Sequence, residues 1–306
     1  FWNLKSYVQP GSAGDESYLE GRPSIPTIVD AGTEALAQGA YFAFAHAGGG
    51  NSLEIAVCLG LCSAINMGDL GFAYDRWYRL LNAGFRVAAV AGPDFVFPNG
   101  ARFYAKIDSK FCWETWMDAV RSGRTFATSG PLVYATVQGL DPGSELRMPT
   151  QGSVRVQAEV VSKRTFEAVE IVANGKVVKR IPIKGVKALI DETIDVRESS
   201  WIAVRVVGHP DDEMIWETAD EPPIRPDFMR QAHTTPVYCI VNGQALGSVA
   251  ALRKIAEWNS SFYLRWIEEQ ARFDDPVDRA RSLQHYVRAQ SVIASMIQQQ
   301  QSTGEE

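Results

Sequence analysis

The spacing of apolar residues changes twice along this chain of 306 residues. Up to about residue 130, helix-like segments alternate with short apolar runs, whereas from 131 to 243 apolar residues recur at every second position. From 244 onward they recur three to four positions apart, as they do on one face of a helix. We therefore expect an α/β unit at 1–130, a β unit at 131–243 and a helical hairpin at 244–306.

The first unit has the order of a mainly parallel sheet or barrel, in which helices alternate with buried strands. Helices, each followed by a glycine that suits a helix end, are predicted at 27–38, 73–83 and 113–122. Apolar strands are predicted at 40–47, 62–67 and 86–91. The functional loops of such folds follow the carboxyl ends of the strands.

The second unit has the pattern of a β-sandwich, because its short strands come with turn signals and without helical spacing. Val154, Val156 and Val160 alternate with polar residues. Asn174-Gly175 lies between two apolar runs and predicts a tight hairpin, since both turn positions need positive φ. In the third unit, Asp274-Asp275-Pro276 marks the start of a second helix, which we expect to pack antiparallel to the first.

Composition argues against several classes of function. The 30 basic and 36 acidic residues give a net charge of −6 without a stripe of Lys or Arg, which argues against a nucleic-acid partner. No run of 18 apolar residues occurs, so we expect no membrane span. Four cysteines are too few for a disulfide framework and are expected to be small buried packing residues. These features suit a cytoplasmic protein, and equally an exported one that has lost its signal peptide.

Two residues at predicted strand ends carry chemistry that a hydrolase could use. His46 follows an apolar strand and precedes a glycine-rich turn, where a ligand or metal can approach the backbone closely. Asp94 follows the strand at 86–91, and its carboxylate could bind a metal or act as a general base. Each has an ordinary alternative, namely a structural histidine and an aspartate that caps the N–H groups of a turn. Because neighbouring strand ends converge on one edge, the two residues are more suggestive together.

The other three histidines have simpler expected roles. His209 belongs to an acidic, solvated loop, His233 opens a strand as a packing or interdomain residue, and His285 is expected on the polar surface of the last helix. Gly-x-Gly-x-x-Gly, P-loop, Gly-x-Ser-x-Gly and His-Glu-x-x-His motifs are absent, so nucleotide cofactors and serine or zincin chemistry lack support.

Six segments follow one another in a recognisable order. They are 45–49 (AHAGG), 64–67 (AINM), 77–86 (WYRLLNAGFR), 91–94 (AGPD), 122–131 (SGRTFATSGP) and 233–238 (HTTPVY). In this order they resemble the carbaryl-hydrolase-like (CehA/McbA) metallohydrolases of the PHP (polymerase and histidinol phosphatase) superfamily. The resemblance runs from near residue 1 to the final helices, and the combination is far more specific than any single segment.

This resemblance implies a fold and a site. The fold would be a PHP-type distorted β/α barrel, partly present here, followed by an Ig-like β-sandwich and a C-terminal helical hairpin. The barrel strand ends would hold divalent metals such as zinc, manganese or iron, and metal-activated water would attack a small-molecule ester, carbamate or phosphoester. His46 matches the family's third histidine motif and Asp94 the aspartate of its last motif. Asn66 and Arg102 lie in neighbouring matching segments and are candidates for substrate contact or for support of the site.

Two departures from the family pattern lead to an alternative. The early His-x-His motif and the next histidine belong upstream of Phe1, so we expect this chain to be a fragment whose catalytic site and metal set are incomplete. The last motif usually has a histidine two residues after its aspartate, where this chain has Val96, which cannot bind a metal. The alternative is a degenerate, non-catalytic PHP-like binding or structural module. A carbohydrate-binding protein led by the β-sandwich is a third possibility, supported only by exposed aromatic residues.

Overall fold

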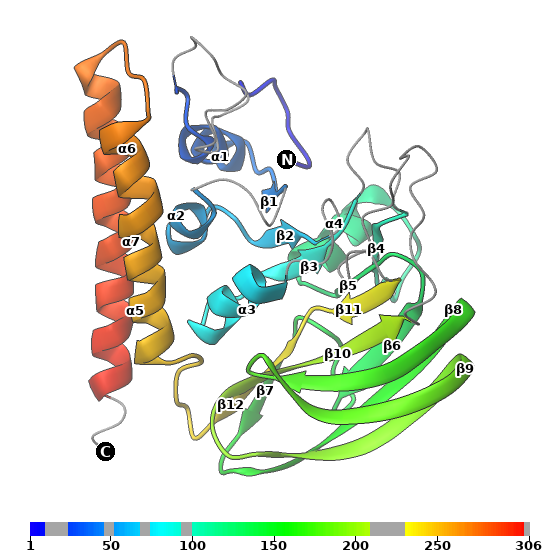
Figure 1. Cartoon of the computed structure of the whole chain (residues 1–306). Helices are drawn as coiled ribbons and strands as arrows, with labels where there is room; N and C mark the ends of the chain where they lie inside the picture. The colour runs from blue at the N-terminus through cyan, green and yellow to red at the C-terminus, as the bar shows by residue number, and fades with distance from the viewer. Residues whose placement is uncertain (10–23, 46–51, 68–73, 93–99, 209–229, 303–306) are drawn as a thin grey trace, which may run out of the picture.

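The first three strands of the computed structural model form a small parallel sheet. The structure describes residues 1–9, 24–45, 52–67, 74–92, 100–208 and 230–302. β1 (Ala43–Phe44), β2 (Ala64–Asn66) and β3 (Ala88–Val90) lie side by side in that order (Figure 1). The parallel sheet predicted for this part of the chain is confirmed, although its strands are shorter than the apolar runs that contain them.

Four helices accompany these strands, namely α1 (Ile28–Ala37), α2 (Leu53–Cys58), α3 (Tyr74–Asn82) and α4 (Trp113–Arg121). The three helices predicted in this region are confirmed within one or two residues. α1 begins with a capping box, in which Asp30 N–H donates to the Thr27 hydroxyl and Thr27 N–H donates to the Asp30 carboxylate. It ends before Gly39, whose φ of +78° favours a residue without a side chain.

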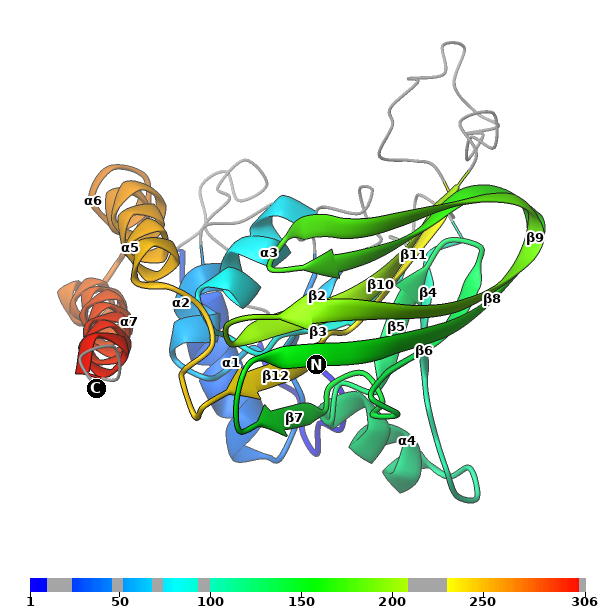
Figure 2. The ribbon, with the colours of Figure 1, turned by 90° about the horizontal axis from the view of Figure 1, so that it is seen from below.

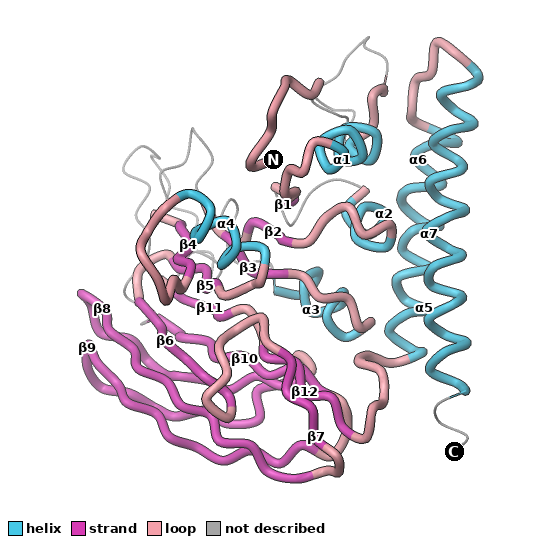
Figure 3. The backbone as a smooth tube through the Cα atoms, turned by 180° about the vertical axis from the view of Figure 1, so that it is seen from behind, coloured by secondary structure: helices cyan, strands magenta, loops and turns pink. Residues whose placement is uncertain are grey.

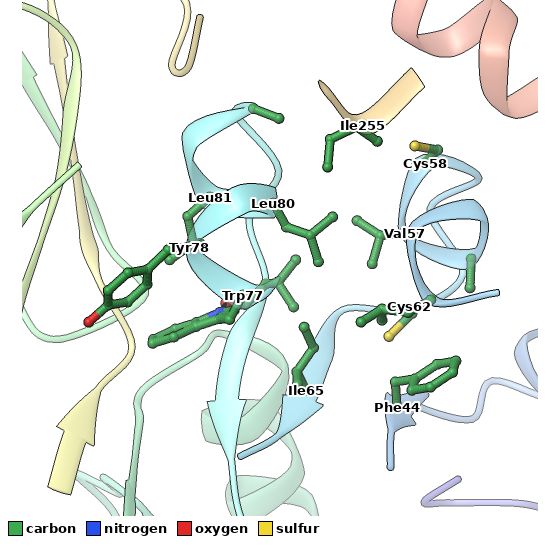
Figure 4. Close-up of a cluster of buried hydrophobic side chains, with 14 of the residues drawn as sticks. Phe44, Val57, Cys58, Cys62, Ile65, Trp77, Tyr78, Leu80, Leu81 and Ile255 are labelled. Carbon is green, nitrogen blue, oxygen red and sulfur yellow. Dashed lines mark hydrogen bonds between the residues drawn. The ribbon is translucent and has the colours of Figure 1, made fainter. Parts of the chain in front are cut away.

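The main apolar core lies between the parallel sheet and the C-terminal helices. Figure 4 shows Leu80 of α3 surrounded by Val57 of α2, Ile65 of β2 and Ile255 of α5 (Val249–Trp258). Trp77 is fully buried beside them, and its indole N–H donates to the carbonyl oxygen of Val87 at 2.9 Å. This core therefore joins segments as far apart in the chain as Val29 and Ile293.

The remaining strands form one nine-stranded, mostly antiparallel sheet that curls on itself (Figure 2). One path through it is β4 (Arg102–Ala105), β5 (Thr125–Thr128), β11 (Gln231–Thr234), β10 (Ser200–Gly208), β12 (Val237–Val241) and β7 (Glu145–Met148). β8 (Gly152–Ala173) pairs with β10, with β6 (Leu132–Val137) and with β9 (Lys176–Val196). A second apolar core fills the inside of the curl. The predicted β-rich second part is thus observed as a curled sheet.

The long β8–β9 hairpin combines a predicted turn with an unpredicted bend. Asn174 and Gly175 have φ of +49° and +80°, so the hairpin predicted at this dipeptide is confirmed. Further along, the pairs Val161–Lys187 and Phe166–Gly185 leave residues 162–165 of β8 opposite Val186 alone. Such extra residues bend a strand pair, and here they contribute to the curl of the sheet.

A ring of hydrogen bonds joins the two sheets at β3. Ala89 N–H donates to the Thr235 hydroxyl (2.9 Å), and the Thr125 hydroxyl donates to Ala89 O (2.8 Å). The two hydroxyl oxygens are 2.8 Å apart, so Thr235 donates to Thr125 and closes the ring. These two side chains are hydrogen-bond partners for the backbone N–H and C=O of Ala89, on the edge of β3 that faces away from β2. A neighbouring strand would fill the same role. β4 and β5, which precede residue 131, pair within the same sheet as β10 and β11.

The C-terminal part is a helical hairpin that covers α2 and α3. α5, the π-helix η3 (Asn259–Leu264) and α6 (Arg265–Glu269) form its first arm, and α7 (Pro276–Ser302) forms the second, as predicted (Figure 3). The π-helix alters the backbone pairing near Ala256, whose carbonyl oxygen accepts hydrogen bonds from the Ser260 hydroxyl and from Gln290 Nε2 of α7. Among the described residues, no helix combines the length and apolar character needed to cross a bilayer.

We predict that two glycines of the β6–β7 connection differ sharply in their tolerance of alanine. Gly143 has φ of +84°, and an added Cβ would lie 1.9 Å from Ser122 O, whereas Gly139 has φ of +76° and nothing within 4 Å. Gly139→Ala should lower the free energy of unfolding by about 1 kcal/mol, and Gly143→Ala by about 3 kcal/mol or more. Urea unfolding of both variants checks this, and equal losses would contradict the close packing of this connection against the end of α4.

Candidate functional site

The carboxyl ends of β1, β2 and β3 meet at one edge of the parallel sheet, as in other folds of this type. β1 ends at Phe44, two residues before His46, and β3 ends at Val90, four residues before Asp94. His46 and Asp94 themselves lie outside the described residues, as does His209. The described chain therefore brings the segments that lead to both predicted ligands to either side of β2.

Asn66, the last residue of β2, forms hydrogen bonds with the backbone just after β3. Its side-chain oxygen accepts a hydrogen bond from Gly92 N–H (2.9 Å), and its side-chain nitrogen donates to Gly92 O (3.2 Å). This two-way contact fixes the backbone just before Asp94. The described contacts of Asn66 thus suit the support of a site at this edge.

Arg102 lies at the start of β4 and is exposed. Its Nη1 donates to Gly100 O (2.8 Å) and its Nε to the Tyr104 hydroxyl (3.0 Å), while its guanidinium lies 5.7 Å from the centre of the Tyr104 ring. The described hydrogen bonds of Arg102 and Asn66 go to different partners, so they do not join the two candidate residues.

A buried ion pair clamps the two helices that follow β1 and β2. Glu54 in the first turn of α2 is fully buried and accepts hydrogen bonds from Arg76 Nε (2.8 Å) and Nη2 (2.6 Å) of α3. Arg79 Nη1 lies 4.0 Å from the same carboxylate, and its guanidinium lies 4.0 Å from the centre of the Trp258 ring. This pair was not predicted from the sequence. The single charged residue Glu54 within the apolar run 53–58 nevertheless signals a buried ion pair, because a buried charge needs a partner.

His233 fills the contact between α3 and the curled sheet. It is fully buried, with Nδ1 2.8 Å from Thr234 O and Nε2 2.7 Å from the Tyr78 hydroxyl oxygen. Nδ1 must donate to the carbonyl, and because burial favours the neutral ring, Nε2 accepts from Tyr78. Burial is the main reason that the pKa of His233 is lowered to about 3; the hydrogen bond to the Thr234 carbonyl opposes this shift, and the nearby Arg205 adds to it. The packing role predicted for His233 is confirmed.

His285 is buried, so the prediction of a polar surface role was wrong. It shares one face of α7 with Ala289 and Ile293, both of which pack into the main core. Its Nε2 lies 3.6 Å from Asp30 Oδ1 of α1. Burial lowers the pKa of His285, while Asp30 opposes this shift.

The cysteines behave largely as expected. Cys58, Cys62 and Cys239 are buried, whereas Cys112 is exposed just before α4 and departs from the expectation. Burial raises the pKa of Cys62 to about 12, which keeps it in the unreactive thiol form.

The residue types predicted at the strand ends, a histidine and an aspartate, fit a divalent metal. A histidine nitrogen and an aspartate oxygen suit zinc, manganese or iron, and catalytic zinc sites use three protein ligands. Within the described ranges, no three His, Cys, Asp or Glu side chains gather closely enough to hold a metal ion. A complete site would therefore need at least one protein ligand besides His46 and Asp94.

Comparisons of the chain with protein-family models, curated proteins and solved structures found no match.

We predict that the Glu54–Arg76 pair stabilises the helices at this edge. Glu54→Gln leaves Arg76 buried without its counter-charge and should lower the free energy of unfolding by about 3 kcal/mol or more. Glu269→Gln, which breaks the exposed Arg265–Glu269 pair, is the matched control and should change stability little, because solvent screens the two charges. Chemical unfolding of both variants provides the measurement, and similar small losses would show that the buried pair is not needed.

We also predict that the stability of the protein depends on pH through His233. The unfolded chain protonates His233 near pH 6.5, whereas the folded chain keeps it neutral down to about pH 3. Stability is therefore full above pH 6.5 and falls on acidification, by about 1.4 kcal/mol per pH unit from this residue. His233→Gln should remove that contribution, so we expect a shallower loss of stability between pH 6.5 and 5 in urea unfolding. Parallel wild-type and variant curves would refute the neutral, buried state.

Proposed function

We propose that the carboxyl edge of β1–β3 is the divalent-metal site of a hydrolase that acts on small-molecule esters, carbamates or phosphoesters. The observation that carries the proposal is the convergence of the segments leading to His46 and Asp94 on one sheet edge, combined with the resemblance to the CehA/McbA metallohydrolases. In the same proposal, the parallel sheet is part of a PHP-type distorted barrel, and the curled sheet corresponds to an Ig-like β-sandwich.

In this proposal His46 and Asp94 provide two of the metal ligands, and Asn66 acts as a positioning residue. By holding Gly92 from both sides, Asn66 limits where the backbone can carry Asp94. A bound zinc, manganese or iron ion would supply an activated water and stabilise negative charge on the substrate. Because two ligands are too few for a catalytic site, activity requires further ligands beyond this pair.

The alternative function is a non-catalytic module that uses the same edge for binding. Val96 favours it, because the position where the family has a metal-binding histidine carries an apolar side chain here.

Metal content tests the two functions against each other. We would measure zinc, manganese and iron by elemental mass spectrometry after reconstitution, on the chain and on the complete translation product of its gene (the extended protein). The hydrolase proposal predicts near-stoichiometric metal in the extended protein, and its loss in His46→Ala and in Asp94→Ala. His285→Gln and Asp108→Asn, which change the same residue types elsewhere, should keep the metal.

Two results would count against the proposal. No bound metal in the extended protein, with any of the three ions, would leave the binding module as the better function. Metal that persists in both His46→Ala and Asp94→Ala would show that these residues are not the ligands. If metal binds as expected, hydrolysis of p-nitrophenyl esters and phosphoesters is the next measurement.

A further inference from the structure

A groove of about 790 Å³ opens on the side of the molecule away from α5 and α7, where Figures 1 and 2 place β4, β5 and β6. β4, β5, β6, β8 and β9 all line it, and every lining residue belongs to the described chain. The groove is separate from the carboxyl edge of the parallel sheet, and its size is that of a ligand site.

Three aromatic rings form one wall of this groove. Tyr104 of β4 stacks on Phe126 of β5, with ring centres 5.2 Å apart and planes 17° apart. Phe126 in turn meets Tyr134 of β6 nearly edge-on, with ring centres 6.1 Å apart. Tyr104 is 40% exposed and Tyr134 56% exposed, so both offer ring surface to a ligand. Arg102 fixes the position of Tyr104 through the hydrogen bond to its hydroxyl.

The charged groups of the groove are largely compensated by one another. Lys106 Nζ binds both carboxylate oxygens of Asp141, at 2.7 and 2.8 Å, and Arg124 Nη1 lies 2.6 Å from Asp108 Oδ2. Arg155 Nε likewise donates to Asp191 at 2.6 Å. The groove therefore presents hydrogen-bonding groups held in fixed positions with little net charge. This arrangement complements a neutral ligand better than a polyanion or a polycation.

The residues that line the groove form rows that cross the strands, and they are not confined to an edge strand of the sheet. Tyr134 of β6 lies opposite Glu159 of β8, which lies opposite Leu189 of β9, and these three residues share one face of the sheet. Gln157 and Asp191 form a second row on the same face. An extended peptide added to β6 would run parallel to the strands and would leave these rows uncovered. A ligand that covers the rings and both rows must cross the strands.

From these features we propose that the groove binds a neutral oligosaccharide. A sugar ring offers a flat C–H face that packs on exposed tyrosine rings and a rim of hydroxyls that suit carboxylate, amide and ammonium partners. Tyr134 and Tyr104 are the stacking platforms, and Gln157, Glu159 and the Lys106–Asp141 pair bind hydroxyls. This binding function is independent of the hydrolase proposed above, because it uses none of the strand-end residues.

Calorimetric titration of the full chain with five neutral hexasaccharides tests the proposal, namely cello-, xylo-, manno-, malto- and hexa-N-acetylchitohexaose. We expect at least one to bind with a Kd of about 1 mM or tighter. Tyr134→Ala should weaken that binding about tenfold, whereas Tyr134→Phe, which keeps the ring, should bind within about twofold of the wild type. Tyr7→Ala is the matched control, because Tyr7 is 79% exposed and does not line the groove.

Further measurements distinguish a neutral-sugar groove from an anion site and from a peptide-binding edge. Circular dichroism should show that Tyr134→Ala is folded. The His46→Ala and Asp94→Ala variants should bind the sugar with the affinity of the wild type. The proposal is overturned if none of the five sugars binds at about 5 mM, or if Tyr134→Ala binds like the wild type. Tighter binding of tetragalacturonate would mark an anion site instead. Binding of a peptide with the sequence of residues 132–137, without sugar binding, would mark a strand-addition site.

Discussion

Two threonine hydroxyls close the outer edge of the parallel sheet, and the arrangement of the rest of the molecule depends on them. Buried backbone groups that lack a partner cost about 1–3 kcal/mol each, so the free N–H and C=O of Ala89 need satisfaction. Thr125 and Thr235 provide it from the curled sheet. In the part of the chain that the structure describes, the parallel sheet therefore ends at β3, and the curled sheet starts against it. α3 contacts both sheets, because Trp77 donates to Val87 O just before β3 and Tyr78 meets His233 of β11.

Local signals in the sequence predicted most of the individual elements. Glycines at helix ends, Asn174-Gly175 and Pro276 mark the boundaries of elements through backbone geometry that acts over a few residues. Apolar periodicity likewise distinguished β1–β3 from the antiparallel strands after residue 131, although β4 and β5, which precede that residue, also pair in the curled sheet. The curl of the second sheet was not predicted, because it depends on the unequal pairing of residues 162–165 with β9. That register is set by packing along the whole hairpin, so a short stretch of the sequence does not reveal it.

The candidate site was predictable only in part, for a similar reason. Glycine-rich turns and strand ends single out His46 and Asp94, which remain predictions. The bond of Asn66 to Gly92 spans 26 residues and the Glu54–Arg76 pair spans 22, and neither partner can be chosen from the sequence. His285 shows the converse problem, since its polar side chain suggests a surface position until α7 is placed against α1. Long-range contacts thus decide which polar residues support a site.

The tip of the β8–β9 hairpin is anchored, which is unusual for a hairpin turn. Asn174 accepts a hydrogen bond from Trp201 N–H and donates to the Ser200 hydroxyl, and a side chain at Gly175 would meet Asn82 and Tyr78 of α3. Turns that project into solvent absorb insertions during evolution, because lengthening them disturbs nothing. This turn has no such freedom, since extra residues would push the curled sheet away from α3. Length variation in related chains should therefore occur at open positions such as Gly139, where an added Cβ would meet nothing within 4 Å, and the hairpin should keep its length.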